Sequence, residues 1–203
     1  MNSNRQQERD VLVGLADALL GDRRHELDAW MAAHGATLVD LVWQPGILDC
    51  AEAPLLHALD YWQTLRAGRE MPLASDLTPF GLRPALGYIL LIDVEDDGWD
   101  GRFRLYGTKV AEMYGEDMTG RRVSDIDGGK YSTQLFRALY RAVTVRRQPV
   151  FSHHRPPEHV SVTAWKRLIL PLSGADGQVT RFMSVNLPGA WRPPPRGSDR
   201  SAS

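Results

Sequence analysis

The sequence of 203 residues contains a single cysteine, Cys50, and no long hydrophobic run. One cysteine excludes an intrachain disulfide and any zinc or iron–sulfur site built on several cysteines. No stretch approaches the roughly 18 apolar residues of a membrane span, and residues 1–15 lack the apolar core of a signal peptide. We therefore expect a soluble protein in the cytoplasm with no membrane insertion.

Excess charge of one sign is missing as well. The formal net charge is −1, so no global positive field attracts nucleic acid or acidic lipid. The small basic clusters Arg121-Arg122 and Arg146-Arg147 could hold an acidic partner or an anionic ligand, although solvated arginines at helix ends are commoner. We expect no nucleic-acid partner.

Catalytic and phosphate-binding motifs are also absent from the sequence. It has no Gly-x-Ser-x-Gly elbow, no His-Glu-x-x-His pair and no kinase or cyclase signature. The spacing of Gly107, Gly115 and Gly120 fits neither the P-loop nor the dinucleotide fingerprint. We expect no enzymatic activity, with Gly107 at a strand exit and Gly115 ending a helix in the left-handed conformation.

The most metal-like stretch is SHHRPPEH, residues 152–159. Adjacent residues of a strand point to opposite faces, so His153 and His154 cannot bind one ion without a bulge. His159 follows two prolines, and no carboxylate or cysteine completes a ligand set. We expect exposed histidines at a strand end and no metal site.

Helical periodicity appears in five regions, one of them a short segment over residues 109–114. Over residues 6–33, Leu12, Leu15 and Leu19 form an apolar stripe that could cap the core or form a helix-on-helix dimer seam. Further helices are predicted over about 55–68, as a short turn capped by Thr78, and over 131–146. Asp49 and Glu52 have the spacing of a capping box, with Pro54 in the first turn.

Extended segments alternate with these helices. Strands are predicted over residues 88–94, 102–106, 150–155, 160–172 and 179–187. The apolar stretch TLVDLVWQPGILDC, residues 37–50, is broken by Pro45-Gly46 and stays unassigned. Helices grouped between hairpins indicate an α+β fold with an antiparallel sheet.

Four separated blocks extend this interpretation to a family. They are LDYWQTLRAGREMP, LTPFGLRPALGYILLIDVEDDG, FRLYGTKVAEMYGEDMTGRRVSDI and RLILPLSGADGQVTRFM. With them the chain resembles short, often stand-alone bacterial PAS proteins over about residues 55–187. The resemblance implies a five-stranded antiparallel sheet with short helices on one face, enclosing a small cavity. It divides the chain into an N-terminal helical extension (1–54), a PAS-like domain (55–190) and a disordered proline-rich tail (191–203).

The resemblance also bears on cofactors. A flavin photosensor of this fold needs a cysteine in the helical middle, and residues 107–146 have none. Haem sensors of the fold commonly use a histidine on the longer helix, and residues 131–146 have none, while His57 lies on the preceding helix. Flavin and haem are therefore disfavoured, and no cofactor is predicted. An unidentified small molecule stays open as a ligand.

The cavity of such a domain would be lined by inward strand residues and helix faces. The candidates are Phe103, Leu105, Val110, Tyr114, Tyr131, Leu139 and Trp165. The resemblance implies a non-catalytic sensory or regulatory protein that signals to a separate protein through dimer interfaces and flanking helices. We expect a homodimer, for which Leu12, Leu15 and Leu19 are a candidate dimer helix. The alternative is a ligand-free interaction module with a filled core and an exposed sheet face. A small enzyme on a similar sheet is a more distant third.

Overall fold

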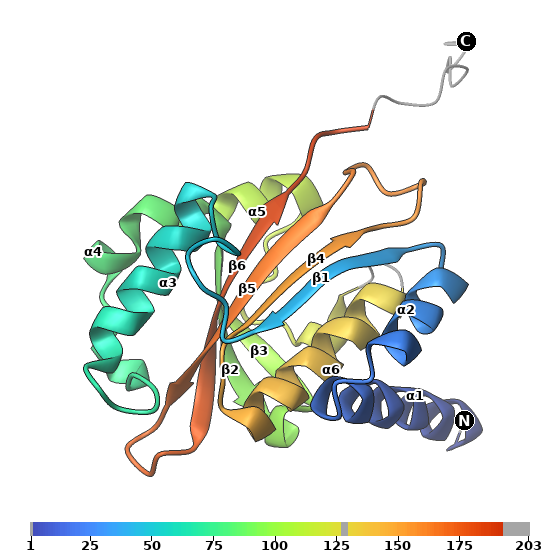
Figure 1. Ribbon diagram of the computed structural model, residues 1–203, viewed down its shortest axis with the longest axis horizontal. Helices are drawn as coiled ribbons and strands as arrows, with labels where there is room; N and C mark the ends of the chain where they lie inside the picture. Colours follow the sequence, from blue (N-terminus) through green and yellow to red (C-terminus); the bar gives the residue numbers. More distant parts are fainter. Residues whose placement is uncertain (1, 127–129, 193–203) are drawn as a thin grey trace.

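The computed structural model describes residues 2–126 and 130–192. A six-stranded antiparallel sheet lies at its centre, in the order β1-β4-β5-β6-β2-β3 (Figure 1). Its strands are β1 (Thr37–Trp43), β2 (Ile89–Glu95), β3 (Asp100–Tyr106), β4 (Val150–Arg155), β5 (Trp165–Ser173) and β6 (Val179–Pro188). The α+β class and the antiparallel sheet predicted from the sequence are confirmed. The predicted tail lies outside the described residues apart from Trp191 and Arg192.

Helices cover both sides of this sheet. They are α1 (Asn2–Leu20), α2 (Arg24–Ala33), α3 (Ala53–Arg66), α4 (Pro79–Leu82), α5 (Thr108–Tyr114) and α6 (Lys130–Arg146), with short turns η1 (Ala74–Asp76), η2 (Arg83–Tyr88), η3 (Asp96–Gly98) and η4 (Val123–Asp125). Figure 1 shows α3 and α6 on opposite sides of the sheet. We call the side of α6 the inner face and the side of α3 the outer face. None of the described helices is long and apolar enough to cross a membrane.

The sixth strand, β1, corrects the predicted count of five. It pairs antiparallel with β4, from Thr37 opposite Arg155 to Trp43 opposite Val150. Pro45 and Gly46 do not interrupt this strand because they follow its end, where the chain turns after Gln44 at a φ of 51°. The predicted N-terminal extension thus contributes an edge strand to the central sheet.

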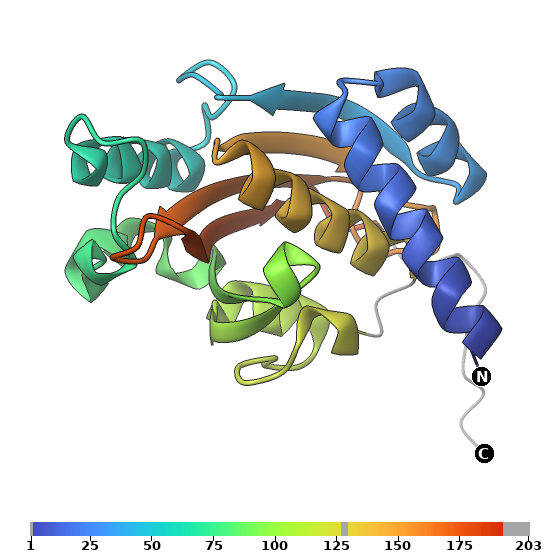
Figure 2. The same cartoon turned by 90° about the horizontal axis from the view of Figure 1, so that it is seen from below.

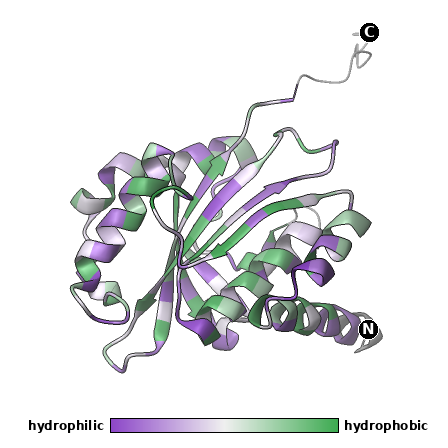
Figure 3. Ribbon diagram, viewed as in Figure 1, coloured by the Kyte–Doolittle hydropathy of each residue, from purple (hydrophilic) through white to green (hydrophobic). Residues whose placement is uncertain are grey.

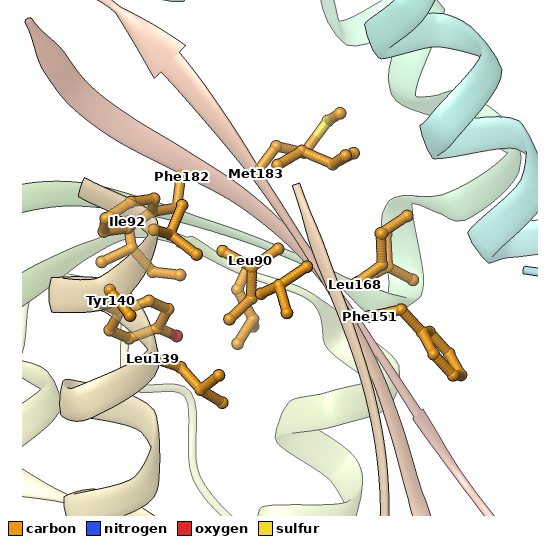
Figure 4. Close-up of a cluster of buried hydrophobic side chains, with 14 of the residues drawn as sticks. Leu90, Ile92, Leu139, Tyr140, Phe151, Leu168, Phe182 and Met183 are labelled. Atoms are coloured by element: carbon orange, nitrogen blue, oxygen red, sulfur yellow. The ribbon is translucent and has the colours of Figure 1, made fainter. Parts of the chain in front are cut away.

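Alternation along the strands divides the core between the two faces. Figure 4 shows Ile92, Phe182 and Tyr140 on the side of α6, with Leu168 and Met183 on the side of α3. The rings of Tyr140 and Phe182 stack with centroids 4.9 Å apart. Figure 3 shows hydrophobic residues along the central strands. Because α3 covers the apolar part of the outer face, Leu168 and Met183 are fully buried there.

The leucine stripe of α1 packs within the chain. Leu12, Leu15 and Leu19 are only 3%, 4% and 1% exposed. In Figure 2, α1 crosses α6 at the edge of the sheet. An ion pair between Glu8 and Arg137, with Oε1 and Nη1 2.8 Å apart, joins the same two helices. These leucines therefore do not form an exposed dimer seam, because intramolecular packing already buries them.

The start of α3 differs from the predicted capping box. Asp49 accepts a hydrogen bond from the backbone of Gly46 at 2.8 Å instead of capping the helix. Glu52 occupies the N-cap position without a side-chain cap, and its carboxylate pairs with Lys166 of β5. The competing ion pair across to the sheet explains why the local capping pattern is not realised. Pro54 does lie in the first turn, as predicted.

The passage from β3 into α5 depends on glycine. A Cβ atom at position 107 would lie 2.5 Å from the carbonyl oxygen of Gly87 and 2.8 Å from that of Ile89. Gly115 ends α5 in the left-handed region at a φ of 91°. Both predicted roles of these glycines are confirmed. Thr78 also caps α4, accepting a hydrogen bond from the backbone of Gly81 at 3.2 Å.

Candidate functional site

A cavity of about 420 Å³ lies at the inner face of the sheet. Strands β2, β3, β4, β5 and β6 contribute residues to it, and α5, α6 and the segment 159–162 complete its wall. Its aromatic lining consists of Phe103, Tyr106, Tyr114, Tyr131, Phe136, Tyr140, Trp165 and Trp191. A volume within about 300–1,000 Å³ is typical of small-molecule sites. The dimensions and lining of this cavity therefore suit a compact, largely apolar ligand.

The structure places five of the seven predicted residues on this wall: Phe103, Val110, Tyr114, Tyr131 and Trp165. Their role in contacting a ligand stays a prediction.

Leu105 and Leu139 lie elsewhere. On α6, Phe136 and Tyr140 are four residues apart and share the side facing the cavity, whereas Leu139 is turned away and packs in the apolar core. Leu105 is partly buried and lies opposite Leu91 in the sheet.

A β-bulge explains the position of Leu105. Leu105 pairs with Leu91, but Phe103 pairs with Ile92, so Arg104 is the extra residue of β3. One extra residue shifts the side chains beyond it to the opposite face. Tyr106 consequently takes the inner position that simple alternation would assign to Leu105. Its ring meets that of Phe103 edge-on, with centroids 5.0 Å apart.

The main polar group on the cavity wall is Arg167 of β5, which was not among the predicted site residues. It is 3% exposed. Its Nε donates a hydrogen bond to Oδ1 of Asn186 at 2.8 Å. The guanidinium carbon lies 3.6 Å from the centroid of the Phe136 ring, within range of a cation–π interaction. Nη1 is buried and has no hydrogen-bond partner.

The charge of Arg167 is not balanced by an acidic side chain. Burial lowers the pKa of Arg167 to about 10, so the group still carries its proton at neutral pH. Burial raises the pKa values of Tyr131 and Tyr140 to about 12, and it raises that of Tyr106 as well, so these hydroxyls are neutral. No Asp or Glu occurs among the described residues that line the cavity. The wall therefore carries an uncompensated positive charge.

His154 of β4 is the second buried polar group at the cavity. The prediction of exposed histidines was wrong here, since His154 is 1% exposed and its Nδ1 is buried without a hydrogen-bond partner. Burial, followed by the positive charge of Arg167, lowers the pKa of His154 to about 3. His153 has the opposite orientation, and its Nδ1 lies 3.2 Å from Oδ2 of Asp40. The two rings diverge as expected for neighbours on a strand.

Sequence carries one signal that could have identified Arg167. It is the only charged residue within the apolar stretch RLILPL at 167–172. Long cationic side chains are rarely buried, so such a residue in a central strand merits attention. Its face, however, depends on the register with β4 and β6.

The described residues contain no group of three or more His, Cys, Asp or Glu placed to hold a metal ion. Cys50 and His57 do not line the cavity. Burial raises the pKa of the Cys50 thiol to about 12. Nε2 of His57 is 2.7 Å from the backbone oxygen of Gly81, beside α3. Both side chains thus lie away from the candidate site.

Comparison with known proteins adds a family match. The sequence profile of a family described as a PAS domain matches residues 51–186. No curated protein matches the chain significantly.

Two solved structures are similar. The PAS domain of histidine kinase ThkA is 17% identical, with a TM-score of 0.35, over 49% of this chain and 96% of that one. An RNA-binding Light-Oxygen-Voltage receptor is 14% identical, with a TM-score of 0.39, over 92% of this chain and 61% of that one.

Proposed function

Because the chain belongs to the PAS domain family, a family of sensory and signalling modules, we propose that it is a non-catalytic cytoplasmic sensor. In this proposal a small molecule binds in the cavity at the inner face of the sheet. The bound state is then relayed to a separate signalling protein through contacts on the surface of the domain.

One observation carries the proposal: a cavity of about 420 Å³ that has buried polar groups on its wall. An apolar pocket with a few convergent polar groups is typical of a ligand site. Arg167 and His154 are such groups, since each is at least nine-tenths buried and each has an unpartnered nitrogen. A domain that served only as a scaffold would gain stability by filling this space with apolar side chains.

The covered outer face supports the sensor over the ligand-free interaction module. That alternative needs an apolar sheet face open to a partner. Here Leu168, Leu170 and Met183 of the outer face are fully buried under the chain's own elements. The apolar part of the outer face is therefore not available to a partner.

Helix α6 offers a route for the relay. Phe136 lies on the cavity wall, while the adjacent Arg137 pairs with Glu8 of α1. At the other end of the helix, Arg146 donates hydrogen bonds to the backbone oxygen of Leu20 and to Asp22. A ligand that displaces the Phe136 ring would shift α6 relative to α1. A homodimer is part of the proposal, but it must use a surface other than the buried leucine stripe.

Native mass spectrometry and absorbance spectroscopy test the proposal, using protein purified from its own host. Wild-type protein should carry a small molecule. Val110→Phe adds bulk at the cavity wall and should abolish this mass, whereas Val145→Phe, on the exposed side of α6, should retain it. Circular dichroism confirms that both variants are folded. Wild-type protein that is free of any bound molecule under these conditions would refute small-molecule sensing.

A further inference from the structure

We propose that the ligand of this cavity is an organic monocarboxylate with an apolar body, bound through its carboxylate by Arg167. This inference rests on the proposed function, and it assigns the chemical class of the ligand. The surroundings of Arg167, the number of charges on the wall and the nature of the remaining lining each support it.

Arg167 has the surroundings of a prepared anion receptor. Asn186 accepts a hydrogen bond from Nε, and the Phe136 ring lies against the guanidinium, so the orientation of the group is fixed from two directions. Nη1 is left without a partner. A buried cation without a counter-charge is unfavourable, and a planar guanidinium matches the geometry of a carboxylate. A carboxylate in the cavity would supply both the missing charge and the missing acceptor.

Two further unpartnered polar atoms lie on the same face of the sheet. Ser152 of β4 is directly opposite Arg167 in the register, and its buried Oγ has no hydrogen-bond partner. His154, two residues along the same strand, has an unpartnered Nδ1. Buried polar atoms without partners are uncommon in folded proteins, and their clustering points to a ligand. Of these two residues, His154 lines the cavity, and its neutral ring can donate one hydrogen bond there.

The number of charges on the cavity wall favours a ligand with a single negative charge. Arg167 is the one Lys or Arg among the described residues that line the cavity, and His154 is neutral. The other lining histidine, His159, is exposed to solvent. A phosphate monoester carries about −1.5 to −2 charges at neutral pH, so it would leave negative charge unbalanced in the cavity. One carboxylate matches one guanidinium.

The rest of the wall determines the body of the ligand. Away from Arg167 it presents mainly aromatic and aliphatic side chains, among them Tyr114, Tyr131 and Trp165. Such a surface gains free energy by covering apolar area and by stacking on flat rings. The structure therefore favours a carboxylate attached to an aryl or alkyl group over a small polar acid.

Isothermal titration calorimetry with matched acids and amides tests this assignment. The full chain is unfolded in urea and refolded to remove co-purified ligand. It is then titrated with 3-phenylpropionate and octanoate, and with the neutral amide of each. The variants are Arg167→Met and, as a control, Arg104→Met, whose arginine is exposed on β3 and does not line the cavity.

Wild-type protein and Arg104→Met should bind at least one acid at least about 30-fold more tightly than its amide, as expected for a buried charge pair. Arg167→Met should bind acid and amide equally weakly. Asn186→Asp provides a second variant, because an internal carboxylate beside Arg167 should abolish acid binding and spare amide binding.

Three outcomes would overturn the assignment. Equal binding of acid and amide by the wild type would refute carboxylate recognition and leave the proposed sensing of a small molecule intact. If both Arg167→Met and Asn186→Asp still bind the acid more tightly than its amide, Arg167 is excluded as the binding group. If neither acid binds, the inference also fails, and the mass of the host-purified protein then decides the proposed function independently.

Discussion

The unpaired His154 predicts that acid destabilises the protein in a specific pH window. The ring is 1% exposed, and its pKa is lowered from 6.5 to about 3 by burial and by the charge of Arg167. In the unfolded chain the same ring titrates at its ordinary pKa of about 6.5. As the pH falls below that value, the unfolded state takes up a proton that the folded state does not. Protonation therefore favours unfolding, and stability is lost as the pH decreases from about 6.5 towards 3.

The magnitude follows from the gap between the two pKa values. For a histidine that stays neutral only in the folded state, each pH unit below 6.5 lowers the free energy of unfolding by about 1.4 kcal/mol. At pH 5 this gives a loss of about 2 kcal/mol relative to the same chain without the titration. Above pH 5 most carboxylates are still ionised in both states, so this interval isolates the histidine contribution.

Urea unfolding between pH 7 and pH 5 measures the effect. His154→Phe removes the titrating ring and fills a similar volume, so its unfolding free energy should fall by about 2 kcal/mol less than that of the wild type. His153→Phe is the matched control, because the neighbouring ring lies on the other face of β4 and contacts Asp40. That variant should retain the acid sensitivity due to His154.

Identical pH dependence in the wild type and His154→Phe would refute the reasoning. An NMR titration of the histidine rings provides an independent test, in which the His154 signals should not shift between pH 7 and pH 5. A ring that titrates near pH 6.5 would place a second positive charge at the cavity. It would also remove the charge count on which recognition of a single carboxylate depends.

Three further predictions concern stability at pH 7. Arg167→Met should leave the unfolding free energy of the ligand-free chain unchanged or raise it by up to about 4 kcal/mol, because an apolar group replaces an uncompensated buried cation. If urea unfolding shows a loss of about 3 kcal/mol or more, Arg167 has a structural role. Gly107→Ala should cost about 1–3 kcal/mol, since the new methyl group would lie 2.5 Å from the Gly87 carbonyl oxygen; an unchanged urea midpoint would contradict this close approach. Trp62→Phe removes the 2.7 Å hydrogen bond from the indole to the Pro171 carbonyl, and thermal and urea unfolding should report a loss of about 1–3 kcal/mol. Wild-type stability in that variant would mean that α3 is held to the sheet by apolar contacts alone.

Much of the fold follows from local pattern. The continuous apolar run at 89–92 and the alternation in the later strands predicted an antiparallel sheet, and the helical repeats predicted α3 and α6. Glycine at positions 107 and 115 has the roles that its backbone freedom suggested. These features depend on neighbours in sequence, which is why periodicity and turn chemistry predict them.

The errors all concern partners that are distant in sequence. The leucines of α1 form an apolar stripe in any case, but the stripe does not specify whether α6 or a second chain covers it. Strand β1 becomes recognisable only when β4 pairs with it. Likewise, the bulge at Arg104 places Tyr106 instead of Leu105 on the inner face. The sequence does not reveal the bulge, because an extra residue in a strand leaves no mark in the amino-acid composition.

The cavity shows the same division between local and distant information. Five of its lining residues could be named from the inward positions of strands and helices. Its polar groups could not, because burial of Arg167 and His154 is set by the register of three strands. Their lowered pKa values follow from that burial, so the electrostatic character of the site is a property of the folded sheet.

Strand β1 has a consequence for how this protein can be divided. It lies before the family-matched segment, residues 51–186, yet its backbone pairs along the whole of β4. A fragment that begins at residue 51 would present β4 as a bare sheet edge, with free N–H and C=O groups available for pairing with another molecule. The same cut would remove α1 and uncover the side of α6 that it protects. In this chain, the segment that matches the family, residues 51–186, is therefore smaller than the structural unit. A fragment without β1 and α1 should be prone to association through its exposed sheet edge.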